Sequence, residues 1–257
     1  MNCDTHFKVI VAGLNVEKWV DCCLQTLVKQ KYKNWEGVFI DDCSTDSTME
    51  ITKKYESQIK ITSNEKHSPK IITLQNAIRT LQPKNEDVLV FLDGDDCLSD
   101  DCVLDYLNSI YSSDDIWVTW GSFIETKNLT VFGDHSNVPI SKGPRPCPKG
   151  KNIRIGWRFS HLKTMKYFLW KNIKESSFIS NITGKYLEGA DDCCFMFPAI
   201  EMARPNHIKY ISRLMYIYNN SNPNSYMRVM KEKQKQAFYE VTKLRKKYPQ
   251  KTKKELL

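Results

Sequence analysis

A short apolar run in the chain ends on a cluster of acids. Residues 88–92 are all apolar, and they are followed by Asp93, Gly94, Asp95 and Asp96. A continuous run of this length, rich in β-branched and aliphatic residues, predicts a buried strand. Three carboxylates at the end of such a strand repel one another unless a cation lies among them. Carboxylate oxygens suit Mg²⁺ and Mn²⁺, so the segment predicts a divalent metal site for phosphate groups. The alternative is a strand that simply enters a polar turn.

A second predicted strand also ends on acids. Residues 35–40 read as a strand, and Asp41 and Asp42 follow it. The carboxyl ends of parallel strands lie at one edge of a sheet, where ligands bind in open α/β folds. We therefore expect Asp42 to approach the acids after residue 92, although Asp41 has an alternative role as a turn residue.

The elements that would position these acids alternate along the chain. Up to residue 100, apolar periodicity predicts strands at 8–15, 35–40, 59–62 and 88–92 and helices at 17–29, 48–57 and 71–81. This alternation predicts right-handed βαβ units and a mostly parallel sheet. Later residues predict a strand at 116–124, a Pro-rich loop at 136–151, helices at 158–172 and 191–203, and one or two strands at 208–218.

Composition limits the class of protein. The chain has 257 residues, of which 41% are hydrophobic and 11% aromatic, as in ordinary globular proteins. No apolar run approaches the roughly 18 residues that a membrane-spanning helix needs. The first residues do not resemble a signal peptide, so we expect a cytoplasmic protein. The nine cysteines are odd in number and lack metal-site spacing, so we expect them to be reduced and mostly buried.

The net charge of +8 lies in the last part of the chain. Residues 228–257 hold eleven Lys or Arg and three acids, so the excess there equals the whole net charge. Apolar residues recur within this basic segment, which predicts an amphipathic helix; they are Met227, Met230, Phe238, Val241, Leu244 and Tyr248. We interpret it as a helix docked on the domain, or as a contact with an anionic membrane or a partner. The neutral remainder argues against a nucleic-acid enzyme.

Four segments in order resemble the family 2 glycosyltransferases of the GT-A fold. They are Val-Ile-Val-Ala-Gly-Leu-Asn at 9–15, Phe-Ile-Asp-Asp-Cys-Ser-Thr-Asp at 39–46, Gln-Asn-Ala at 75–77 and Leu-Asp-Gly-Asp-Asp at 92–96. Segments at 160–164, 192–202 and 216–223 are similar to the acceptor side of one branch of that family. The resemblance implies a single α/β GT-A domain over residues 1–226, with a nucleotide-binding half (1–100) and an acceptor-binding half (101–226). The basic C-terminal helix or tail would cover 227–257.

The resemblance also implies an activity and a set of site residues. The enzyme would move a sugar from a UDP- or GDP-sugar to a hydroxyl of a carbohydrate or protein-glycan acceptor, with inversion and with Mn²⁺ or Mg²⁺. Asp192 matches the general base, and Asp191 is the alternative. The metal ligands would be Asp95 and Asp93 with His161, which could instead cap a helix or pack. Donor binding would involve Ala12, Gly13, Asn15, Asp42, Lys70, Asn76, Asp93 and Gly94.

Some residues depart from the family pattern, and other classes of protein would need residues that this chain lacks. Ala12 and Leu14 stand where the family more often has Pro and an aromatic residue, and Asp191 stands where Glu is commoner. Lys70 could equally be an ordinary surface lysine. A phosphatase of the haloacid-dehalogenase type would need Thr or Val where Cys97 stands, and a nucleotidyltransferase would need a Gly- and Lys/Arg-rich loop after the first strand. An EF-hand would need Gly at position 98. A catalytically inactive sugar-binding module is disfavoured by the intact Asp95 and Asp192.

Overall fold

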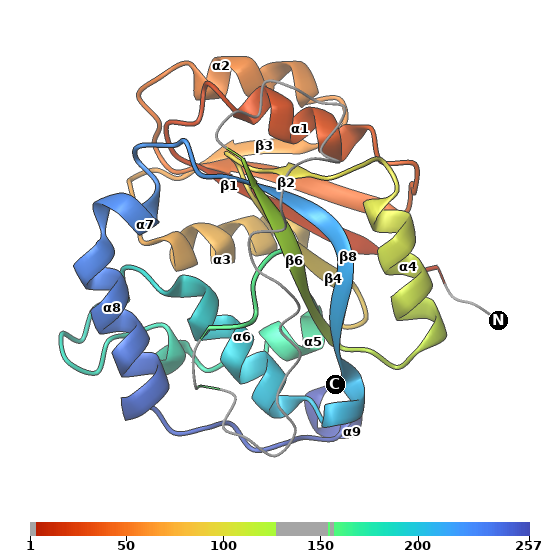
Figure 1. The fold of residues 1–257 in the computed structure, drawn as a ribbon, viewed down its shortest axis with the longest axis vertical. Coiled ribbons are helices and arrows are strands. Elements are labelled where there is room, and N and C mark those ends of the chain that lie inside the picture. Colours follow the sequence, from red (N-terminus) through yellow and green to blue (C-terminus); the bar gives the residue numbers. More distant parts are fainter. Residues whose placement is uncertain (1–3, 127–153, 155–156) are drawn as a thin grey trace.

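A computed structural model describes residues 4–126, 154 and 157–257, apart from the side chains of Thr126, Tyr226 and Met227. The Pro-rich segment expected at 136–151 lies outside the described residues. The fold is a twisted sheet with helices on both faces (Figure 1).

The described strands form one eight-stranded sheet in the order β3-β2-β1-β4-β7-β6-β8-β5. Its strands are β1 (Phe7–Gly13), β2 (Trp35–Asp41), β3 (Lys60–Ser63), β4 (Val88–Asp93), β5 (Cys97–Leu98), β6 (Val118–Thr126), β7 (Lys163–Lys166) and β8 (Ile208–Asn219). β3, β2, β1 and β4 are mutually parallel, as the alternating pattern predicts. β7 runs antiparallel to both β4 and β6, while β6 and β8 are parallel and β5 is antiparallel to β8.

The helices divide between the two faces of this sheet. They are α1 (Val20–Val28), α2 (Thr48–Thr52), α3 (Lys70–Leu81), α4 (Val103–Ser113), α5 (Tyr167–Trp170), α6 (Asp191–Met202), α7 (Tyr226–Val229), α8 (Lys231–Tyr239) and α9 (Lys253–Leu256). Two apolar cores result. One joins β1, β2 and β4 to α3, α5, α6 and the C-terminal segment, and the other joins the opposite face to α1 and α4 (Figure 1). Because both faces are covered, the central strands are apolar on both sides.

Two expected elements differ from the structure, and a third agrees with it. The helix predicted at 158–172 was wrong, because this stretch contains the strand β7 followed by the one-turn helix α5. Pairing with β4 on one side and β6 on the other decides the conformation of β7, and this long-range pairing outweighs local propensity. The helix predicted at 48–57 stops at Thr52 and continues as a 3₁₀ turn. The one or two strands predicted at 208–218 are confirmed as a single strand, β8.

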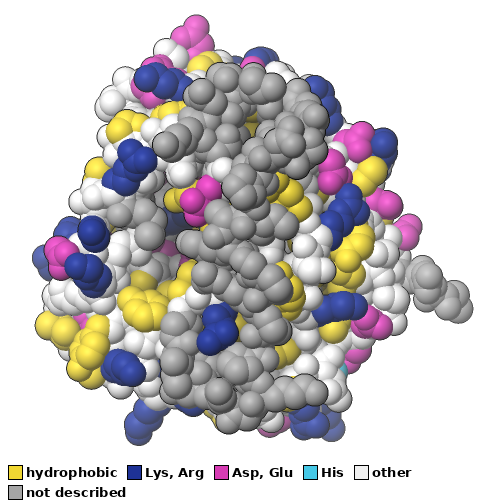
Figure 2. All heavy atoms as spheres, viewed as in Figure 1, with side chains coloured by type: hydrophobic (Ala, Val, Ile, Leu, Met, Phe, Trp, Pro, Cys, Tyr) yellow, Lys and Arg dark blue, Asp and Glu magenta, His cyan; other side chains and the backbone are white. Residues whose placement is uncertain are grey.

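The basic C-terminal segment is helical in pieces. α7 and α8 are followed by a π-helical turn over Glu240–Leu244, and no helix continues through Tyr248 and Pro249. Val241 is buried in the core, whereas Leu244, expected on the same apolar face, is 47% exposed. On the face in Figure 2, the described Lys and Arg side chains lie at separate places with acids between them. On α8, for example, Lys233 pairs with Glu188.

The described cysteines and helices agree with two further expectations. All seven cysteines in the described ranges are free, and four of them are buried: Cys23, Cys97, Cys193 and Cys194. None of the helices within the described residues has the length and apolarity required to cross a membrane.

Candidate active site

The end of β1 brings the two acid-tipped strands together. β1 lies between β2 and β4, with Gly13 opposite Asp41 and Ala12 opposite Asp93. The N–H of Asp42 donates to the carbonyl of Gly13 (2.9 Å), and the N–H of Gly94 donates to that of Ala12 (2.8 Å). The predicted convergence of the two turns at one edge of the sheet is therefore present in the structure.

The carboxylates of Asp93 and Asp96 lie close to the His161 ring. Ligand atoms of Asp93, Asp96 and His161 all lie within 4.8 Å of one another. Asp95, the expected metal ligand, is not in this group, and its Oδ2 accepts a hydrogen bond from Nδ2 of Asn222 (2.8 Å). Asp96 is buried, and it accepts from the Tyr216 hydroxyl (2.6 Å) and the Asn219 N–H (2.7 Å). The structure thus adds Asp96 to the predicted set; residues of β8 orient Asp96, and Asn222, which follows β8, orients Asp95.

Burial and the neighbouring carboxylates disfavour the charged forms of Asp95 and Asp96. Burial, together with the charge of Asp93, raises the pKa of Asp95 above its ordinary value. Burial and the charges of Asp95 and Asp93 raise the pKa of Asp96 further. Carboxylates that cannot all ionise side by side are stabilised by a cation. The carboxylates of Asp93 and Asp96 and the imidazole of His161 form a donor set that suits Mn²⁺ or Mg²⁺.

His161 is held as a neutral imidazole. Its ring is stacked on Tyr216, with ring centroids 4.3 Å apart. Burial, together with the charge of Lys163, lowers the pKa of His161 to about 3. Its Nδ1 lies 3.1 Å from Nζ of Lys163, and an ammonium only donates, so Nδ1 is the acceptor. A metal ion at His161 would have to replace this hydrogen bond or the proton on Nε2.

Lys70 neutralises the first acid of the cluster. It is the first residue of α3, and its Nζ donates to Oδ1 of Asp93 at 2.6 Å. Burial opposes the ionisation of Asp93, but the charges of Lys70 and Lys163 outweigh it and hold the pKa of this carboxyl below its usual value. Lys70, expected as a donor-binding residue, is therefore an ion-pair partner of the acid cluster.

The two candidate bases occupy the first turn of α6. Asp191 and Asp192 are its first residues, at the end of the helix whose dipole favours negative charge. Oδ2 of Asp192 accepts from Nζ of Lys163 at 2.7 Å, and its side chain is 29% exposed. Burial opposes the ionisation of Asp192, but the charges of Lys163 and Lys70 lower its pKa. Burial raises the pKa of Asp191 to about 7.

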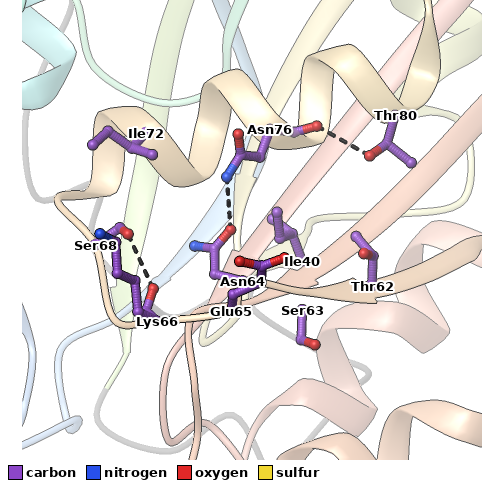
Figure 3. A pocket seen from close by; sticks show the side chains of 10 residues that line it. All are labelled: Ile40, Thr62, Ser63, Asn64, Glu65, Lys66, Ser68, Ile72, Asn76 and Thr80. Atoms are coloured by element: carbon purple, nitrogen blue, oxygen red, sulfur yellow. Dashed lines mark hydrogen bonds between the residues drawn. The ribbon is translucent and has the colours of Figure 1, made fainter.

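A chain of side-chain amides holds Asp42. Oδ1 of Asp42 accepts from Nδ2 of Asn64 (2.6 Å), and the oxygen of this amide accepts from Nδ2 of Asn76 (2.9 Å). Oδ2 of Asp42 lies 2.7 Å from Nδ1 of His67. Asn64 and Asn76 point toward each other beside a hollow of about 320 Å³ between β3 and α3 (Figure 3). Asn76, expected to contact the donor, acts here through Asn64.

The remaining predicted donor residues shape the turn after β1. Asn15 adopts the left-handed conformation (φ 53°), its Oδ1 accepts from the Thr45 N–H (2.8 Å), and its N–H donates to Oγ of Ser44 (2.8 Å). A Cβ on Gly13 would lie 2.7 Å from Cγ2 of Val16. Both residues therefore fix the loop that carries Asp42, and the structure explains them without a ligand.

Sequence reasoning missed several residues of this site. Lys163 was hidden because its segment was assigned to a helix. On a strand, Lys163 and His161 are two residues apart and can face the same side, and this spacing was the available signal. Asn64 and His67 lie in a loop without periodicity, so nothing in their pattern pointed to Asp42.

Comparisons with known proteins place this geometry in a family. The model of glycosyl transferase family 2 matches residues 8–175. The poly(ribitol-phosphate) β-N-acetylglucosaminyltransferase TarS of Staphylococcus aureus is 32% identical over 108 residues, which are 38% of this chain and 18% of TarS. The chain thus spans less than a fifth of that relative. The Escherichia coli enzyme WfgD, a UDP-Glc:α-D-GlcNAc-diphosphoundecaprenol β-1,3-glucosyltransferase, is 23% identical over 190 residues, 70% of this chain and 74% of WfgD.

Solved structures share the fold. The crystal structure of TarS 1–349 has a TM-score of 0.63 at 22% identity, covering 92% of this chain and 63% of that one. The mannosyltransferase PcManGT of Pyrobaculum calidifontis, in complex with GDP-Man and Mn²⁺, has a TM-score of 0.57 at 14% identity, covering 93% of this chain and 63% of that one. These neighbours have the GT-A fold expected from the sequence. Because the family model covers well over half of the chain, the protein belongs to the family 2 glycosyltransferases.

Proposed function

We propose that this protein transfers a sugar from a nucleoside-diphosphate sugar to an acceptor hydroxyl in one inverting step, with Asp192 as general base. One observation carries this proposal. Nζ of Lys163 lies 2.7 Å from Oδ2 of Asp192 and 3.1 Å from Nδ1 of His161. The side chain of Lys163 thus connects the Asp192 carboxylate to the acid cluster at His161, which suits a metal-bound diphosphate.

The solved neighbours support the choice of donor. TarS 1–349 has been solved with UDP and with UDP-GlcNAc, and PcManGT with GDP-Man and Mn²⁺. A nucleoside-diphosphate sugar would place its base near Asp42 and its diphosphate near Asp93, because the end of β1 joins these two turns. Asp42, Gly13 and Asn15 would then line the base side of the site, and Lys70 the phosphate side.

A divalent ion fits the acid cluster. Asp93, Asp96 and His161, whose ligand atoms lie together, would hold Mn²⁺ or Mg²⁺, with Asp95 beside them in the same turn. When bound, the ion would supply positive charge to the nucleoside diphosphate as it leaves. Asn222 and Tyr216 would orient the carboxylates from β8 and the residues after it.

The protein's own residues account for the proton. As the acceptor oxygen bonds to the anomeric carbon, its proton passes to the Asp192 carboxylate. The bond from that carbon to the diphosphate breaks, and its electrons leave with the phosphate oxygen. Attack from the face opposite the diphosphate inverts the anomeric centre. Asp192 suits this role better than Asp191, since its side chain is 29% exposed and Asp191 is buried.

The cytoplasmic location, the division at residue 226 and a membrane or partner contact of the basic tail remain predictions.

Binding calorimetry tests the donor site. UDP, GDP, CMP and dTDP are titrated with and without Mn²⁺ into the wild type, into Asp95→Asn and into Asp105→Asn, a matched change of an exposed acid on α4. We expect one nucleotide to bind with Mn²⁺, binding to be lost in Asp95→Asn, and Asp105→Asn to match the wild type. If the folded wild type binds none of them, the proposed transferase is wrong.

Turnover then tests the base. The nucleotide that binds selects the activated sugars to be screened with acceptors, and NMR gives the anomeric configuration of the product. Asp192→Asn should lower kcat by about 10²- to 10⁴-fold while nucleotide binding is retained. A product that keeps the donor configuration, or an unchanged kcat in Asp192→Asn, would contradict the mechanism.

A further inference from the structure

Lys163 is a buried lysine at the centre of the site. It is 2% exposed, and an ammonium so far from water is costly unless it is fully paired. Its side chain can reach the site because β7 lies directly beside β4, the strand that ends at Asp93. Its position therefore follows from the strand order of the fold.

Packing fixes the direction of this side chain. Lys163 is the register partner of Phe91 on β4, and paired residues of adjacent strands share a face of the sheet. The ring of Phe91 stacks on Phe195 of α6, with centroids 4.7 Å apart. The same face of β4 and β7 is thus held against α6, one turn from Asp192. Lys163 reaches the first turn of α6 from a rigid base, unlike a mobile surface lysine.

The contacts of Lys163 link the two halves of the proposed reaction. One N–H goes to Oδ2 of Asp192 and another to Nδ1 of His161. An ammonium has three donors, and within the described residues no acceptor is found for the third. Because Lys163 holds only Oδ2, the other oxygen of Asp192 stays available to an acceptor hydroxyl.

We propose that Lys163 is a positioning residue, which fixes the Asp192 carboxylate relative to the donor-side cluster at His161 so that Oδ1 meets the acceptor hydroxyl. This rests on the proposed function, in which Asp192 is the base. The residue acts through Asp192. Misplacement of a catalytic group by about 1 Å can lower the rate by about 10²-fold.

A double-mutant cycle tests this role. Lys163→Met, Asp192→Asn and the double variant are compared with the wild type in kcat, acceptor KM and nucleotide affinity. We expect Lys163→Met to lower kcat by about 10- to 100-fold with nucleotide affinity unchanged, and to lower it little further once Asp192 is Asn. Equal losses in both backgrounds, or a loss confined to nucleotide affinity, would overturn the proposal. The double variant removes both charges of the pair, so it guards against misfolding through an unpaired buried charge.

Two further variants separate positioning from structural support. Lys166→Met, in the same strand but paired with Glu86, should keep the wild-type kcat. Lys163→Ala should regain kcat when small alkylammonium ions are added, whatever its Tm; absence of any such recovery would indicate a structural role only. Failure of the proposed function can be distinguished from failure of the positioning role. If Asp192 is not the base, Asp192→Asn keeps the wild-type kcat whether position 163 is Lys or Met.

Discussion

Asp191 and Asp192 are adjacent carboxylates in one helical turn, yet their surroundings shift their pKa values in opposite directions. Burial raises the pKa of Asp191 to about 7, and one of its oxygens, Oδ1, is buried with no hydrogen-bond partner among the described residues. Lys163 pairs with Asp192 and outweighs burial there, so the pKa of Asp192 is lowered. Two acids with separated pKa values can take different roles at neutral pH.

The raised pKa makes stability depend on pH through Asp191. Its pKa when folded, about 7, is above its value of about 4 in an unfolded chain, so the folded state binds the proton more tightly. The resulting stabilisation is complete below about pH 4 and is lost as the pH rises through about 7. Relative to Asp191→Asn, the wild type should therefore be more stable at pH 5 than at pH 8 by about 2–3 kcal/mol.

Urea unfolding of both proteins at the two pH values measures this difference. Asp105→Asn, an exposed change on α4, should show no comparable pH dependence. A difference between wild type and Asp191→Asn that stays constant from pH 5 to pH 8 would mean that Asp191 is not protonated on folding.

The sequence predicted which residues meet at the site better than it predicted their partners. Asp42 and Asp93 could be brought together from strand alternation, because strand ends define the edge of a parallel sheet. The sequence could not predict whether Asp95 or Asp96 lies beside His161. That depends on Tyr216, Asn219 and Asn222, more than a hundred residues away in the chain. Side-chain orientation at a turn is decided by such remote contacts.

At the scale of elements, the ends of β1 and β4 approach unusually closely. A Cβ placed on Gly94 would lie 3.0 Å from the carbonyl oxygen of Ala12 and 3.2 Å from Cα of Gly13. These are backbone atoms of a buried strand, so they cannot move aside as a flexible side chain would. Only glycine lets the acidic turn stay bonded to β1 through the Gly94 N–H.

Gly94→Ala should therefore separate the two turns. We expect a loss of about 1–3 kcal/mol in stability, from overpacking against β1, and weaker nucleotide binding because Asp93 moves relative to Asp42. Thermal unfolding and calorimetry measure the two effects. Gly184→Ala is a suitable control: Gly184 has φ +66° and nothing within 4 Å of an added Cβ, so the substitution should lower stability without affecting binding. Equal nucleotide affinity in Gly94→Ala and the wild type would show that the backbone of β1 can shift to make room for the added methyl group.

The same scale explains where the sequence prediction failed. Each strand–helix unit over residues 1–100 is local, so its periodicity predicted the parallel half of the sheet. β7 has only four residues and depends on β4, with Val88 opposite Lys166. Neither its length nor its pattern distinguishes such a strand from a helix segment. Assigning it to a helix concealed that Lys163 contacts His161.

At the scale of the whole molecule, α6 connects the site to the C-terminal segment. Its first turn carries Asp192 and its last turn carries Glu201, which accepts two hydrogen bonds from Arg154 (2.6 and 2.7 Å) and one from the Tyr248 N–H (3.0 Å). Arg154 also donates to the carbonyl of Val241 at 2.5 Å. The basic segment is therefore fastened to the core by a buried ion pair, in addition to its apolar contacts.

Removing Glu201 should loosen this segment and destabilise the fold. Both partners are almost fully buried, with side chains 3% and 4% exposed, so Glu201→Ala leaves the charge of Arg154 away from water without its carboxylate. We expect a loss of about 3–5 kcal/mol in the free energy of unfolding. Proteases should also cleave the chain beyond Leu244 faster than in the wild type. Glu188→Ala removes an exposed pair with Lys233 and should cost less than about 1 kcal/mol. Urea unfolding compares the two variants. If Glu201→Ala is no less stable than Glu188→Ala, the C-terminal segment is held by its apolar contacts, through Ala237, Val241 and Leu256.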